Sequence, residues 1–173
     1  MRWPLILSLL LVSCETPPPE CEGAVIEAQV EAVNFGDLVL GPPPGIDGDL
    51  KIPERRVFFV KNSCGEPLII DSVCLVGNSH NQDPETPAFY LELEPGETLP
   101  LSVRSGKETG IRVTFEVESI NGDTTGDGVA DPDTSVLVIY SNASNEPVLL
   151  APICGRAVEG GDPLEGSCEI PEG

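Results

Sequence analysis

The chain has few basic residues, few aromatic residues and a single histidine. Lys and Arg total 9 against 29 Asp and Glu, so the formal net charge is −20. An acidic surface of this kind repels phosphate backbones and anionic headgroups, which excludes nucleic acid as a partner. Aromatic residues make up 5% of the 173 residues and hydrophobic residues 40%. This composition supplies one modest core and excludes a large multidomain enzyme.

The sequence has only a short apolar run at its N-terminus. The run covers residues 5–12 and follows Arg2, whereas a membrane-spanning helix needs about 20 apolar residues. It has the form of a secretory signal. The following Leu11-Val12-Ser13-Cys14 resembles the lipobox of bacterial lipoproteins, in which the cysteine is acylated and the chain is cut before it. An ordinary cleavage site beside a cysteine is the alternative.

The lipobox resemblance implies a domain order and a location. We expect a lipoprotein signal peptide over 1–13, the lipidated Cys14 with a Pro-rich spacer over 14–23, a folded domain over 24–158 and a Gly/Pro/acidic tail over 159–173. The lipid would hold the protein on a membrane of the bacterial cell envelope. Glu15 is not the aspartate that often retains such proteins in the inner membrane, so the outer membrane is expected.

The other cysteines suit an oxidising compartment but are odd in number. Cys21 and Cys168 flank the expected domain and could tie its two ends together, while Cys64, Cys74 and Cys154 compete for one further bridge. Unpaired buried thiols remain the alternative for each. No CxxC pair is present, so the spacing does not indicate a zinc site.

The body of the chain predicts an all-β fold. Apolar and polar residues alternate over 111–118, 89–94 and 99–104, as expected for antiparallel strands with one buried and one solvated face. The runs 57–60, 136–140 and 148–150 are continuously apolar and suit central strands covered on both faces. Residues 24–33 alternate too, and we expect one strand there. Seven to nine strands in this length predict an immunoglobulin-like antiparallel β-sandwich.

Several motifs resemble the ASH immunoglobulin-like domains and the related choice-of-anchor D repeats. They occur in the family's order, and they are Val33 to Gly41, Val57 to Asn62, Glu66 to Ile70, Leu93 to Gly96, Val113 to Phe115 and Ile139 to Asn142. We expect Gly36 and Gly96 to supply turn conformations and Phe35 to plug one end of the sandwich. The stretch after Phe115 is longer than is usual in the family. The resemblance implies a binding or scaffolding module without an active site.

The segment 121–133 concentrates oxygen ligands on a Gly-rich turn. Its spacing resembles that of an EF-hand calcium loop, with candidate Ca²⁺ ligands at Asp123, Thr125, Asp127, Val129 (through its carbonyl), Asp131 and Asp133. The twelfth position is Thr134 where an EF-hand has glutamate, and the flanks read as strands. A solvated hairpin loop without metal is the alternative, because Asp and Gly favour turns by themselves.

We expect no enzyme activity and no catalytic residues. Nucleophilic catalysis by serine or cysteine usually requires a histidine base, and His80 lies in a polar loop where we expect it to be exposed. The sequence therefore favours a lipid-anchored envelope protein, monomeric, whose domain binds or scaffolds a protein or glycan, with exposed strand edges as the expected docking surface. The alternative is a calcium-dependent adhesion module that uses the 123–133 loop.

Overall fold

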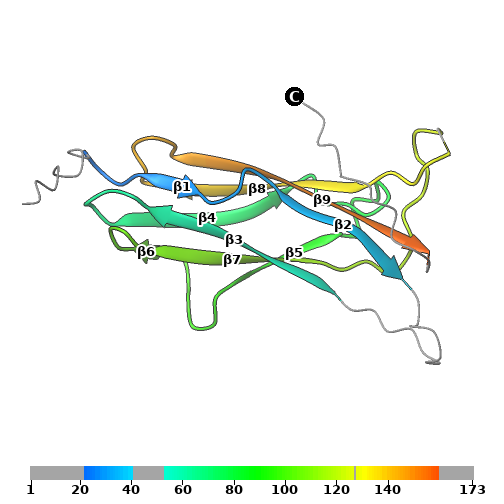
Figure 1. Cartoon of the computed structure of the whole chain (residues 1–173), viewed down its shortest axis with the longest axis horizontal. Coiled ribbons are helices and arrows are strands. Elements are labelled where there is room, and N and C mark those ends of the chain that lie inside the picture. The colour runs from blue at the N-terminus through cyan, green and yellow to red at the C-terminus, as the bar shows by residue number, and fades with distance from the viewer. Residues whose placement is uncertain (1–21, 41–52, 127, 160–173) are drawn as a thin grey trace, which may run out of the picture.

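The protein is a two-layered β-sandwich. The computed structural model describes residues 22–40, 53–126 and 128–159, and Figure 1 shows their strands running along the long axis in two stacked layers. The strands are β1 (Ile26–Ala28), β2 (Val33–Leu40), β3 (Glu54–Asn62), β4 (Leu68–Val76), β5 (Phe89–Leu93), β6 (Leu101–Val103), β7 (Glu108–Phe115), β8 (Asp133–Ser141) and β9 (Val148–Glu159). The described residues contain no helix, so none of them forms one that is long and apolar enough to cross a membrane.

The nine strands form a four-stranded and a five-stranded sheet. The orders are β1-β3-β7-β5 and β2-β9-β8-β4-β6. All pairs are antiparallel except β2 with β9, which run parallel. This pairing arises because the chain leaves the first sheet after β1 and enters the second beside its last strand. The expected all-β, immunoglobulin-like sandwich is confirmed in class and strand number, with one parallel pair.

The single strand expected over 24–33 is instead two strands in different sheets. Residues 29–32 lie outside both strands, and Val30 is 47% exposed although the alternation placed it on the buried face. The crossing between sheets interrupts the pattern. Val33 returns to the core at 6% exposure, where β2 begins.

The core lies between the sheets and is closed at one end by three phenylalanines. Phe35, Phe89 and Phe115 are each at most 6% exposed, and the Phe89 and Phe115 rings stack with centroids 5.1 Å apart. Phe35 packs against both, as expected of a plug. Gly36 and Gly96 have φ of +67° and +90°, which confirms the turn conformations expected of them.

The expectation that the continuously apolar strands are covered on both faces is wrong. β3, β8 and β9 do lie inside their sheets, but the sandwich has only two layers. Each sheet therefore keeps one face toward solvent. Val57, Tyr140, Val148 and Leu150 are 41%, 45%, 40% and 56% exposed.

Candidate functional site

Part of the solvent-facing side of the five-stranded sheet is apolar, beside an ion pair between Asp37 of β2 and Arg156 of β9. Leu137 and Ile139 of β8 point into the core with no exposure, so their neighbours point outward by strand alternation. The register places β4, β8 and β9 residues side by side in rows across this outer side. We call the following eight residues the apolar face: Cys74, Val76, Val136, Val138, Tyr140, Val148, Leu150 and Pro152.

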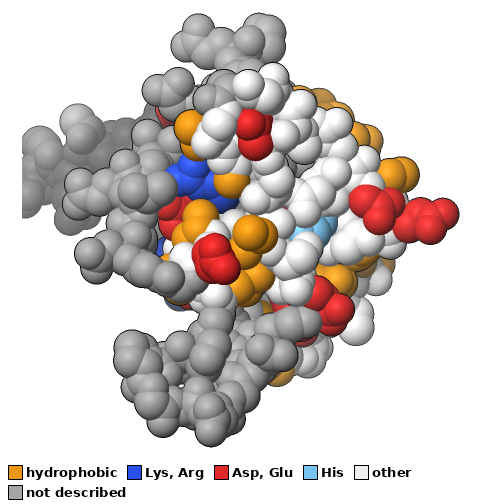
Figure 2. Space-filling model, turned by 90° about the vertical axis from the view of Figure 1, so that its right-hand side faces the viewer, with side chains coloured by type: hydrophobic (Ala, Val, Ile, Leu, Met, Phe, Trp, Pro, Cys, Tyr) orange, Lys and Arg blue, Asp and Glu red, His pale blue; other side chains and the backbone are white. Residues whose placement is uncertain are grey.

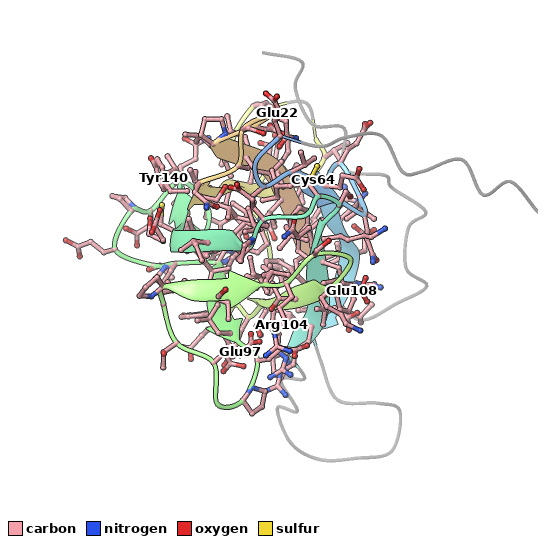
Figure 3. All side chains as sticks on the ribbon, turned by 90° about the vertical axis from the view of Figure 1, so that its left-hand side faces the viewer. Glu22, Cys64, Glu97, Arg104, Glu108 and Tyr140 are labelled. Carbon is pink, nitrogen blue, oxygen red and sulfur yellow. The ribbon has the colours of Figure 1, made fainter. Side chains whose placement is uncertain are left out.

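The apolar face carries no charged side chain at any of these positions. Val76 and Leu150 are more than half exposed, at 55% and 56%. Figure 3 shows Tyr140 at the periphery of the molecule, away from the charged side chains Glu97, Arg104 and Glu108. Contiguous exposed apolar surface of this kind is typical of protein interaction sites.

The outer side of the four-stranded sheet has the opposite chemistry. One row across it consists of Glu92, Arg112 and Val57, and Arg112 Nη1 lies 3.2 Å from Glu92 Oε2. The neighbouring row holds Tyr90, Thr114 and Arg55. Charged residues are the usual covering of a solvated sheet face, so the two outer faces of the sandwich differ in kind.

The free strand edges offer less surface than the apolar face. Among the described residues, the edge strands are β1, β5, β2 and β6, and they contain three, five, eight and three residues. The longest, β2, is interrupted by a register shift between Asn34 and Asp37. Short strands and bulges protect sheet edges against strand addition. The free edges are therefore poorly suited to the strand addition that we expect there from the sequence.

The described residues of the proposed calcium loop use their carboxylates on the loop itself. Asp123 accepts hydrogen bonds from the backbone N–H of Gly126 and Gly128. Asp131 accepts hydrogen bonds from the backbone N–H groups and hydroxyls of Thr124 and Thr125. The Thr124 hydroxyl is the main cause that lowers the pKa of the Asp131 carboxyl below its ordinary value of 3.8. These bonds close a tight polar turn.

Two other predicted ligands lie elsewhere. Asp133, the first residue of β8, is 4% exposed and bonds His80 with its Oδ2 instead of joining the loop carboxylates. Val129 is 52% exposed, and Asp127 lies outside the described residues. Within the described part of the chain, no three His, Cys, Asp or Glu side chains are grouped as a metal site would require. The calcium site stays a prediction, to be tested by whether CaCl₂ but not MgCl₂ raises the melting temperature.

His80 is buried, contrary to the expectation of an exposed loop histidine. It is 4% exposed, its Nδ1 lies 2.7 Å from Asp133 Oδ2, and its Nε2 lies 2.8 Å from Ser119 Oγ. Figure 2 views the end of the sandwich at the right of Figure 1, where the pale blue of the chain's one histidine shows between neighbouring surface atoms. No local pattern predicts the cluster, because its three residues come from separate loops and a strand end.

Three of the six cysteines, Cys64, Cys74 and Cys154, lie among the described residues. Cys74 has a free, exposed thiol on the apolar face, which corrects the expectation that it competes for a disulfide. Cys154, in β9, is fully buried, and Cys64 is 2% exposed in the loop after β3. Cys14, Cys21 and Cys168 lie outside the described residues, as do the signal peptide, most of the spacer and the tail. Lipidation and disulfide pairing stay predictions.

Comparison with known proteins identifies the fold. No protein-family model matches the chain, and no curated protein matches it significantly. A protein of unknown function from Porphyromonas gingivalis W83 has a TM-score of 0.51 at 15% identity, over 77% of this chain and 46% of that one. The chain thus spans about half the length of that neighbour.

Two further solved structures are similar at lower scores. An ASH/PapD-like domain of human CEP192 has a TM-score of 0.48 at 14% identity, over 91% of this chain and 100% of that one. The periplasmic chaperone SfaE has a TM-score of 0.40 at 13% identity, over 79% and 57%. The fold assignment rests instead on the strand order of the two stacked sheets of this chain. The chain has the immunoglobulin-like β-sandwich fold.

Proposed function

We propose that the protein is a lipid-anchored component of the bacterial cell envelope that docks a protein partner on its apolar face. The observation that carries the docking role is the contrast between the two outer faces. One is covered by charged and polar residues, and the other presents Leu150 and Val76 more than half exposed. A hydrophobic surface in contact with water favours association, because burying it releases about 25 cal/mol per Å².

Charge narrows the kind of partner. A second copy of the chain would bring another net charge of −20 against the first, which disfavours a dimer through this face. An anionic membrane surface is repelled for the same reason. A glycan is recognised mainly through hydrogen bonds and aromatic stacking, and Tyr140 is the only aromatic residue of the apolar face. The partner that fits is a protein with an apolar patch framed by Lys and Arg.

The lipid anchor rests on the sequence alone. Acylation at Cys14 would hold the domain at a bilayer, and the Pro-rich segment after it would act as a semi-rigid spacer. Growth with an alkyne-labelled fatty acid should label the wild-type protein but not Cys14→Ser. If Cys14→Ser keeps the label, or if the wild type acquires none, the anchoring part of the proposal fails while the docking part stands.

Site-specific photo-crosslinking tests the docking role. A photoreactive amino acid is placed at position 150, and the control carries it at position 57, where Val57 is 41% exposed on the charged outer face. We expect cells of the native species to yield one protein adduct at position 150 that is absent at position 57. Equal adducts at both positions, or none at position 150, would contradict docking on the apolar face.

A second measurement concerns affinity for the captured partner. Leu150→Glu should weaken binding by about 30-fold or more, because a central interface residue contributes about 2 kcal/mol. Val57→Glu is the matched control, and it should leave binding unchanged. Added salt should slow association with the wild type, since charge complementarity acts mainly on the association rate.

A further inference from the structure

The His80 cluster has the arrangement of a nucleophile, a base and an orienting acid. Its residues belong to the loop between β4 and β5 (His80), the segment after β7 (Ser119) and the start of β8 (Asp133). The Nδ1–Oδ2 distance is 2.7 Å and the Nε2–Oγ distance is 2.8 Å. Both lie within the range that general-base activation of a serine requires. This inference goes beyond the docking role and does not depend on it.

Hydrogen bonds around the imidazole determine its tautomer. Asp133 is a carboxylate and accepts from His80 Nδ1–H, while its other oxygen accepts the Asn81 N–H at 2.9 Å. The Asn81 side-chain amide is oriented by the N–H of Gly122, which donates to its Oδ1 at 2.8 Å. Asn81 Nδ2 therefore points a donor at His80 Nε2, 3.0 Å away. Nε2 is the unprotonated nitrogen, and Ser119 Oγ–H donates to it.

The base and the acid of the cluster are buried, whereas the residue with the nucleophile is exposed, as catalysis requires. The side chains of His80 and Asp133 are 5% and 3% exposed, whereas Ser119 is exposed. The base and the acid are thus shielded from water, which strengthens their interaction, while the hydroxyl is open to an incoming molecule. Asn81 Nδ2 donates to the same nitrogen and to the Ile120 carbonyl oxygen at 3.2 Å, which holds the imidazole and the segment of Ser119 together.

We propose that Ser119, His80 and Asp133 form a relay that accepts an acyl group from a small ester. Ser119 Oγ attacks the carbonyl carbon, and its proton moves to His80 Nε2. The C–O bond to the alcohol then breaks, and the alcohol leaves with the proton from Nε2. Water, deprotonated by the same nitrogen, attacks the acyl-serine. The bond between the acyl carbon and Ser119 Oγ breaks to release the carboxylic acid, and the proton on Nε2 returns to Oγ.

A cleft lies next to the cluster, on the side of Asp133. Its volume is about 340 Å³ and Asp133 is part of its wall. Hydroxyl, amide and carboxyl side chains make up most of the remaining lining, namely Ser79, Gln82, Thr124, Thr125, Asp131 and Thr134. Neither Ser119 nor His80 is part of this lining, so the cleft does not define the alcohol half, and the substrate class is that of a small acyl ester.

Covalent labelling tests the relay. The folded protein is treated with a fluorophosphonate, which bonds to an activated serine and releases fluoride, and the adduct is located by peptide mass spectrometry. We expect the adduct at Ser119. The matched control is Ser105, which is exposed in the turn between β6 and β7, and it should stay unlabelled. Absence of an adduct at Ser119, or equal labelling of Ser105, would overturn the proposal.

Turnover of p-nitrophenyl acetate gives a second readout. Ser119→Ala removes the hydroxyl that bonds His80 Nε2 but leaves Asn81 Nδ2 beside that nitrogen, and circular dichroism checks that the variant folds as the wild type does. We expect it to lose about 10²- to 10⁴-fold in the rate above buffer, the usual contribution of an activated nucleophile and its base. Ser105→Ala should keep the wild-type rate. If Ser119→Ala hydrolyses the ester as fast as the wild type, the cluster has only a structural role, which is to hold the loops in place.

Discussion

Replacing Gly155 by alanine tests how tightly the closed end of the core is packed. Gly155 lies in β9 opposite Asp133 of β8. An added Cβ would stand 2.9 Å from two ring carbons of Phe115 and 3.2 Å from a third. Carbon atoms in favourable contact are about 3.5–4.0 Å apart, so the ring would have to move.

The Phe115 ring has little room to move. It has no exposure, and its centroid lies 5.1 Å from that of Phe89 and 5.7 Å from that of Phe35. Overpacking a well-filled core costs about 1–3 kcal/mol. Alanine recovers about 0.5–1 kcal/mol of backbone entropy relative to glycine. We therefore expect Gly155→Ala to lower the free energy of unfolding by about 1–2 kcal/mol, taking these two contributions together.

Urea denaturation followed by circular dichroism measures this change. Gly65→Ala is the matched control, because nothing lies within 4 Å of its added Cβ, and it should stay within about 0.5 kcal/mol of the wild type. Adding Phe115→Leu to Gly155→Ala should cost less than Phe115→Leu costs in the wild type, since the smaller side chain relieves the overlap. A Gly155→Ala protein as stable as the Gly65→Ala control would refute the packing described here.

Three further predictions concern single groups. The NMR titration midpoint of Asp131 should lie below 3.8 and should rise in Thr124→Val. Because folding lowers the pKa of this carboxyl, the stability that it contributes is present above pH 3.8 and is lost as the pH falls through the folded-state pKa. Iodoacetamide should modify Cys74 in the native protein but Cys154 only after unfolding, given their exposures; equal native rates would contradict the burial of Cys154. Asn62→Ala should lower the unfolding free energy by about 3 kcal/mol, because the Asn62 amide, with no exposure, makes three hydrogen bonds to neighbouring backbone groups.

Local patterns in the sequence predicted the parts of the fold that local physics determines. Alternation identified β5 and β7. The motif around Phe35 and Gly36 predicted the aromatic plug and the positive φ of Gly36, although this glycine lies at a register shift within β2 and not in a turn. The division of 24–33 between two sheets could not be read in the same way, since the crossing depends on pairing with β9, more than a hundred residues away. The same holds for the cluster of His80 with Asp133, because hydrogen bonds between separate loops have no sequence period.

The apolar face shows a more general limit of sequence patterns. A strand covered on both faces and a strand with one exposed apolar face have the same pattern of consecutive apolar residues. The runs at 136–140 and 148–150 therefore predicted complete burial. The structure instead leaves Tyr140, Val148 and Leu150 between 40% and 56% exposed. In a chain of net charge −20, charged residues are abundant and would be the simplest covering for a solvated sheet. The run of uncharged residues across three adjacent strands therefore indicates a surface that is covered when the protein works, and it is the physical reason to seek a protein partner there.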